Sequence, residues 1–410
     1  MDFSPDSAGA PVRTGGPALL LKMRERPKWK VAPDAADKSD KYPITTIRER
    51  ISRMKHHPAR RIAATLLAAA SMLSCIPAAS AAILTNLRCE YRDNPLGIDA
   101  EKPRLSWKID EPQSEIPRGQ KQTAYQVLVA SSPELLAKDQ GDLWDSKKVV
   151  SEQSIQVEYA GKPLESRTLC HWKVRVWDKD DKASAWSKPS GWSMGLLKPD
   201  DWRAKWVKAG GDTSPWLRKE FTLTAVPERA MASVNVKGYY ELYVNGKKVS
   251  DDVLAPAVAV YDKRSLYTTY DISKLLRPGT NCVGLWLGLG LLFPKEIAPL
   301  ARVQLDMTVG GQRMVVGTDT SWTFTSSTHV ETGWGWNGTG YEKIDARLAI
   351  AGWNEVGCTN GTWRPVDEYT GPTGIATAQS CPPAVSPRLS PRWPASHWMI
   401  TRLNMISAPI

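Results

Sequence analysis

The feature that most constrains the fold of this 410-residue chain is a two-residue turn, Asn245-Gly246, between two short alternating runs. Asparagine followed by glycine is the strongest short-range signal for a type I′ hairpin, because both central residues of that turn need positive φ. The run before it, residues 239–244, alternates as a half-buried strand does. We therefore expect an antiparallel sheet at this point of the chain.

Further strand patterns lie on both sides of that turn. Residues 231–237 and 239–244 predict adjacent strands, and residues 216–223 predict an edge strand. Residues 302–316 predict a hairpin across Gly310-Gly311, since two glycines permit a tight turn. Together these patterns predict a jelly-roll sandwich over residues 198–375.

A separate set of strand signals occupies residues 82–197. Residues 171–177 alternate without a break, with Trp172, Val174 and Val176 on one face, and residues 154–159 and 184–187 predict two more strands. The Trp-x-Val-x-Val-Trp-Asp run followed by Ser-x-Trp-Ser resembles a fibronectin type III module. The carboxylates Asp178, Asp180 and Asp181 are more typical of a solvated turn than of a cation site.

Composition and charge narrow the function classes. The chain has 18 Trp against 4 Phe, which is typical of a sandwich core and also of a sugar-binding surface. Of the formal net charge of +11, residues 1–81 contribute +7 and residues 384–410 contribute +3. No basic face remains in the interior, so we predict no nucleic-acid partner.

The N-terminal residues resemble a secretory signal that starts late. Residues 54–61 are basic, residues 62–73 are apolar, and Ala79-Ser-Ala81 is a small-residue cleavage site. We predict a signal peptide over 54–81, a secreted or periplasmic protein beginning at Ala82, and no membrane span. Residues 1–53 are predicted to be a disordered leader with a mis-assigned start; the alternative is a disordered cytoplasmic tail. Lipid attachment at Cys75 is another alternative.

Several motifs between residues 82 and 383 resemble, in order, the N-terminal region of bacterial α-L-rhamnosidases. They are Gly238-Tyr-Tyr-Glu-Leu-Tyr-Val-Asn-Gly246, Asp251-Asp-Val-Leu-Ala-Pro256, Tyr261-Asp-Lys-Arg264, Trp286-Leu-Gly288 and Tyr341-Glu-Lys-Ile-Asp-Ala-Arg347. The resemblance implies a fibronectin III-like sandwich followed by a jelly-roll, galactose-binding-like sandwich. The predicted fold class is therefore all-β.

The resemblance also implies a sugar site in the jelly roll, where calcium would bridge protein oxygens and rhamnose. Asp251 and Asp252 match the acidic loop of that site and are the predicted carbohydrate and metal ligands. Leu289 and Leu291 stand where the family usually has an amide and an aromatic residue, and these departures remove a ligand and a stacking surface. The alternative is that Asp251 and Asp252 are ordinary loop residues.

No catalytic residues are predicted in this chain. In the resembling family, two carboxylates on an α/α toroid act as acid and base, and no helical repeat pattern exists here. Residues 376–410 are predicted to be an irregular tail, whose sequence after Pro383 resembles out-of-frame translation or a natural Pro-rich segment. The predicted function is a truncated, non-catalytic part of a secreted α-L-rhamnosidase; the alternatives are a stand-alone carbohydrate-binding protein and a structural module without a ligand.

Overall fold

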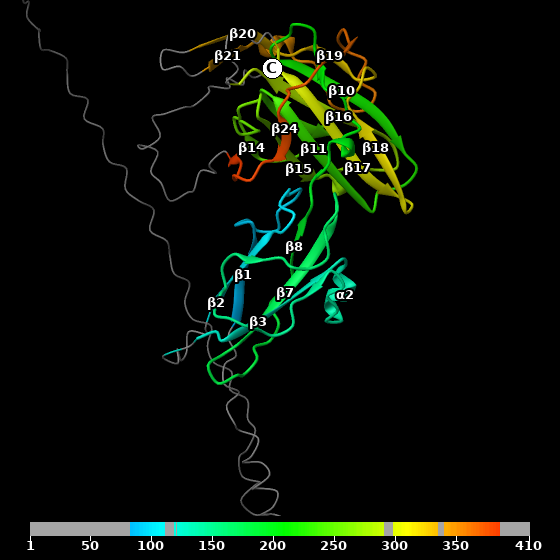
Figure 1. Cartoon of the computed structure of the whole chain (residues 1–410). Coiled ribbons are helices and arrows are strands. Elements are labelled where there is room, and N and C mark those ends of the chain that lie inside the picture. The colour runs from blue at the N-terminus through cyan, green and yellow to red at the C-terminus, as the bar shows by residue number, and fades with distance from the viewer. Residues whose placement is uncertain (1–82, 111–118, 120, 291–297, 335–339, 386–410) are drawn as a thin grey trace, which may run out of the picture. The chain divides into compact units, whose positions relative to one another are not determined.

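The computed structural model describes residues 83–110, 119, 121–290, 298–334 and 340–385. All described residues lie within one compact unit of the chain (Figure 1). These residues form strands, three short 3-10 turns and one α-helix, α2 (Pro133–Ala137). The all-β prediction is confirmed. The predicted leader and signal peptide, residues 1–53 and 54–81, lie outside the described residues.

The first module is a sandwich of two antiparallel sheets. Its core includes Trp107, Trp172 and Trp192, each no more than 2% exposed, which shows that these tryptophans serve packing. The three-stranded sheet has the order β1 (Ile83–Cys89), β2 (Arg104–Asp110), β6 (Val157–Glu158). The five-stranded sheet has the order β4 (Trp144–Asp145), β3 (Ala124–Ala130), β7 (Leu169–Trp177), β8 (Ser190–Ser193), with β5 (Val149–Val150) also on β3.

Two strand predictions in this module are corrected. The strand expected over 154–159 is only the two-residue β6. Residues 184–187 run beside β7 but form no strand, because serine hydroxyls take part in the pairing. The backbone N–H groups of Val176 and Val174 donate to the hydroxyls of Ser184 and Ser187 at 3.1 Å each. Side-chain acceptors of this kind compete with the backbone ladder.

The second module also packs two sheets on one core. One sheet has the order β13 (Lys247–Lys248), β12 (Tyr239–Val244), β16 (Gly279–Gly288), β10 (Pro215–Leu223), β19 (Thr323–Ser326), β22 (Arg364–Pro365). The other has the order β23 (Asp367–Glu368), β9 (Val207–Lys208), β17 (Leu300–Val309), β11 (Arg229–Lys237), β15 (Arg264–Asp271), β24 (Ile375–Ala378), with β18 (Gln312–Gly317) also on β17. Two ribbons complete it: β14 (Asp252–Val253) with β25 (Ala384–Val385), and β20 (His329–Trp334) with β21 (Gly340–Ile344).

The predicted neighbours β11 and β12 belong to different sheets, so that prediction is wrong. Gly238 separates them with a φ of +122°, a conformation that side-chain-bearing residues rarely adopt. The chain therefore leaves one sheet at Gly238 and enters the other. Strand β10 is not an edge strand either, because it pairs with β16 on one side and β19 on the other.

The predicted hairpins are confirmed. Asn245 and Gly246 both have positive φ, 49° and 81°, as a type I′ turn requires, and Gly310 and Gly311 join β17 to β18 in the same way. Strand signals were not expected after Pro383, yet β25 pairs with β14 through backbone hydrogen bonds that no side-chain pattern reveals. The predicted module boundary at residue 375 falls at the first residue of β24.

Candidate functional site

The acidic loop predicted as the sugar site follows the β12–β13 hairpin. Asp251 is exposed, and Asp252 is half-buried at the start of β14. Asp252 opens strand β14, which pairs with β25 and is labelled in Figure 1.

A pair of buried tyrosines holds Asp252 in place. The Tyr270 hydroxyl donates to Asp252 Oδ2 at 3.0 Å, and the hydroxyls of Tyr240 and Tyr270 lie 2.9 Å apart. Burial raises the pKa of both tyrosines, so both phenols remain protonated at neutral pH. Both rings belong to the core of the second module. Asp252 thus ties the acidic loop to that core.

The loop offers few oxygen ligands for calcium, which takes about six to eight of them. Within the described part of the chain, no group of three or more His, Cys, Asp and Glu side chains could hold a metal ion. Asp251 and Asp252 supply two carboxylates, and one oxygen of Asp252 already accepts a hydrogen bond. The side chains of the described residues therefore form no carboxylate cage, and the predicted calcium ion would need oxygen ligands from the sugar as well.

Apolar side chains occupy the positions around this loop where a sugar site would need polar or aromatic side chains. Val258 and Val260 are 53% and 64% exposed, and Leu254 is 63% exposed. Leu289 is half-buried after β16. Leu291 lies outside the described residues. Aliphatic side chains offer neither hydrogen bonds nor a flat stacking face to a sugar.

A second polar cluster, which no sequence motif indicates, joins the two modules. Tyr267, fully buried on β15, donates its hydroxyl proton to Asp99 of the first module and accepts from Leu196 N at 2.9 Å. Arg167 Nε donates to Asp306 Oδ1 of β17 at 2.9 Å. Neither pair belongs to a local motif, since the partners are 168 and 139 residues apart.

The fold and these contacts define a tandem pair of β-sandwich modules with polar side chains between them. Residues 84–198 match the family described as Rha78A-like, N-terminal immunoglobulin domain, and residues 225–386 match the α-L-rhamnosidase N-terminal domain. The two modules are therefore the N-terminal immunoglobulin-like domain and the N-terminal domain of the α-L-rhamnosidases, as the resemblance in the sequence predicted.

Individual relatives agree with these matches. An α-L-rhamnosidase of Formosa agariphila is 34% identical over 300 residues, which cover 67% of this chain and 32% of the relative. An α-L-rhamnosidase of Streptomyces avermitilis is 50% identical over 130 residues, 32% of this chain and 12% of the relative. This chain thus spans about a third or less of the length of the curated relatives that it matches.

Solved structures share the fold. The α-L-rhamnosidase from Dictyoglumus thermophilum superposes with a TM-score of 0.66 and 32% identity, over 72% of this chain and 35% of that chain. The Streptomyces avermitilis enzyme, described as complexed with L-rhamnose, superposes with a TM-score of 0.62 and 23% identity, over 72% and 46% of the two chains.

None of the helices in the described residues is long and apolar enough to cross a membrane.

Proposed function

We propose that these two modules form the non-catalytic N-terminal part of a secreted α-L-rhamnosidase. The observation that carries the proposal is the order of the two family matches, residues 84–198 and then 225–386, on one chain. Two relatives that cover 67% and 71% of this chain bear the name α-L-rhamnosidase. The role of the modules is to support and orient other parts of such an enzyme.

The parent reaction is hydrolysis of terminal α-L-rhamnose from plant glycosides or polysaccharides. The family resemblance implies inversion, in which one carboxylic acid protonates the leaving oxygen and a second carboxylate activates water about 6.5–9.5 Å away. The sequence assigns neither role to a residue of this chain. We therefore expect no turnover from it.

An activity assay tests this proposal directly. The purified 410-residue chain is incubated with p-nitrophenyl α-L-rhamnopyranoside, beside a full-length α-L-rhamnosidase as the positive control. We expect no release of p-nitrophenol above the buffer rate. Release that scales with the concentration of this chain would place a catalytic pair within it and overturn the proposal.

The hydrogen bond from Tyr270 to Asp252 favours a second candidate, a structural module without a ligand. A stand-alone carbohydrate-binding role instead requires affinity for sugar. Calorimetric titration with millimolar L-rhamnose, with and without calcium, separates the two. Heat that saturates only with calcium present supports a sugar site at Asp251 and Asp252; no heat and no change in Tm supports the structural role.

We further propose export, based on the signal-like residues 54–81. N-terminal sequencing of the exported protein should begin at Ala82, whereas recovery of residues 1–53 would contradict it.

A further inference from the structure

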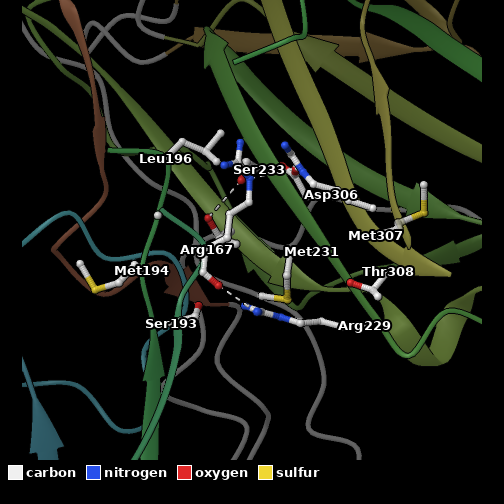
Figure 2. Close-up of a pocket in the computed structure, with 13 residues that line it drawn as sticks. Arg167, Ser193, Met194, Leu196, Arg229, Met231, Ser233, Asp306, Met307 and Thr308 are labelled. Carbon is white, nitrogen blue, oxygen red and sulfur yellow. Dashed lines mark hydrogen bonds and ion pairs between the residues drawn. The ribbon is translucent and has the colours of Figure 1, made fainter. Parts of the chain in front are cut away.

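A pocket lies where residues of the two modules meet, and neither the acidic loop nor the proposed enzyme role accounts for it. Its volume is about 200 Å³, and Figure 2 shows the residues that line it. The first module contributes Arg167 and residues 193–196, and the second contributes side chains from β11, β15, β17 and β18. Its size is below the roughly 300–1,000 Å³ of sites for drug-sized molecules, so it suits a small ligand.

The walls of the pocket are fixed by close contacts. A Cβ on Gly195 would lie 2.0 Å from Tyr267 Oη, and a Cβ on Gly97 would lie 2.1 Å from Thr269 Oγ1. The two modules therefore approach each other through glycines that leave no room for a side chain. A site built on such contacts is organised before a ligand arrives.

Guanidinium groups dominate the charge of the lining. Arg167, Arg229 and Arg313 line the pocket, with Asp306 as the one carboxylate of the lining. Asp306 already accepts four hydrogen bonds: its Oδ1 accepts from Arg167 Nε at 2.9 Å and from Arg313 Nε and Nη2 at 3.1 and 2.6 Å, and its Oδ2 accepts from Gln304 Nε2 at 2.8 Å. Arg167 and Arg313 thus share the Asp306 carboxylate, and the third arginine donates no hydrogen bond to it.

Arg229 is that third cation. Its Nη1 donates to the backbone carbonyl of Arg167 at 2.9 Å, as Figure 2 shows, and among the described residues its guanidinium has no carboxylate oxygen within 4.0 Å. Burial lowers the pKa of Arg229, with the charges of Asp271 and Asp306 opposing this, so the cation is partly removed from water. A guanidinium has five N–H donors in a planar fork, and a carboxylate fits that fork with two hydrogen bonds.

The remaining lining offers hydroxyl and thioether groups. Ser233 and Thr269 place their hydroxyl oxygens 3.4 Å apart, and Ser193 Oγ accepts from Gly97 N at 2.9 Å. The thioethers of Met194 and Met231 line the pocket beside them. Hydroxyls match a hydroxylated ligand, and methionine side chains adapt to its apolar faces.

We propose that this pocket binds a small hydroxylated carboxylate, a sugar acid in chemical class, with Arg229 as the anchoring residue. The carboxylate supplies the direct ion pair that Arg229 lacks among the described residues, in addition to the longer-range charges of Asp271 and Asp306. The proposal stands apart from the proposed enzyme role, because it depends only on the contact between the two modules.

Calorimetric titration of the whole chain tests it, with D-glucuronate as the probe and D-glucose as its neutral counterpart. We expect saturable heat from D-glucuronate and none from D-glucose. Equal heats, or none from D-glucuronate with the unmodified chain, overturn the proposal. Sodium sulfate is a third probe: if sulfate binds and D-glucuronate does not, the site takes a tetrahedral oxyanion and the carboxylate assignment is wrong.

Variants locate the site. Arg229→Gln should weaken D-glucuronate binding by about tenfold or more, because a hydrogen bond to a charged group is lost. Arg229→Lys keeps the charge without the fork and should give an intermediate loss. Lys247→Gln, on the exposed hairpin strand β13, removes the same charge outside the pocket and should leave affinity unchanged. Equal affinities of Lys247→Gln and both folded Arg229 variants would refute the role of Arg229.

Discussion

Substituting Gly195 by alanine tests how closely the two modules fit. The new Cβ would lie 2.0 Å from Tyr267 Oη and 2.6 Å from Asp99 Oδ1, closer than non-bonded carbon and oxygen atoms approach. Tyr267 is fully buried and its oxygen accepts from Leu196 N at 2.9 Å, so it cannot swing away freely. We expect Gly195→Ala to lower the free energy of unfolding by about 1–3 kcal/mol, the usual cost of overpacking.

A second substitution makes the prediction specific. Tyr267→Phe removes the phenol oxygen, which leaves Leu196 N–H and Asp99 Oδ1 without that partner, and should cost about 1–3 kcal/mol alone. The same change also removes the atom nearest to the new Cβ. The double variant should therefore cost less than the sum of the two single variants, by about 1 kcal/mol or more.

Chemical denaturation of the four proteins, followed by tryptophan fluorescence, measures this coupling. Gly311→Ala is the control, because Gly311 has a φ of +74° and no atom within 4 Å of the added Cβ. It should cost about 1–2 kcal/mol from backbone strain alone and add to Tyr267→Phe without coupling. If Gly195→Ala and Tyr267→Phe also add within about 0.5 kcal/mol, the close fit between the modules is refuted.

Three further predictions concern other contacts. Burial opposes ionisation of Glu90, but hydrogen bonds from Arg104 outweigh it and lower the pKa of Glu90, so their stabilisation is present above about pH 4 and lost as the pH falls through the folded pKa. Denaturation of Glu90→Gln should therefore show a loss of about 0.5–1 kcal/mol at pH 7 that shrinks as the pH falls below about 4, and a constant difference would contradict this. Tyr270→Phe should cost about 1 kcal/mol in the same assay and increase proteolysis at the loop of Asp252, whereas unchanged digestion would argue against the anchoring role. Calorimetric titration of the chain with calcium alone should give no heat, because the described side chains do not form a carboxylate cage; saturable heat would contradict that.

Local turn chemistry explains why much of the fold could be predicted. Asn245-Gly246 and Gly310-Gly311 both adopt the positive φ values that their residue types allow, and both close the predicted hairpins. Alternation in residues 171–177 correctly placed Trp172 in the core of the first module. These features depend on a few neighbouring residues, which a sequence displays directly.

Sheet membership could not be predicted in the same way. Strands β11 and β12 are separated by one glycine, yet Gly238 moves the chain between the two sheets of the sandwich. Alternation within a strand predicts which side chains are buried. It does not predict the sheet to which the strand belongs, because both sheets bury one face against the same core. Strand β10 likewise has the alternation of an edge strand, although β16 and β19 flank it.

In the candidate site, too, only the part that depends on neighbouring residues could be predicted from the sequence. Asp251 and Asp252 are visible in the sequence because they follow a hairpin, but the acceptor role of Asp252 toward Tyr270 depends on a contact across 18 residues. The pocket at Arg229 depends on pairings of still longer range, such as Arg167 with Asp306. A sequence motif could therefore identify the loop and could not identify the pocket.

The acidic loop and the pocket at Arg229 differ in which of their charged groups already have partners. At the acidic loop, Tyr270 satisfies one carboxylate oxygen of Asp252, and the exposed neighbours Val258 and Val260 add no polar atoms through their side chains. At the pocket, the Asp306 carboxylate accepts from Arg167, Arg313 and Gln304, while Arg229 donates only to a carbonyl oxygen among the described residues. Arg229 therefore keeps N–H donors that a ligand carboxylate can take up. Ligand binding is therefore better supported at the cationic pocket between the modules than at the acidic loop.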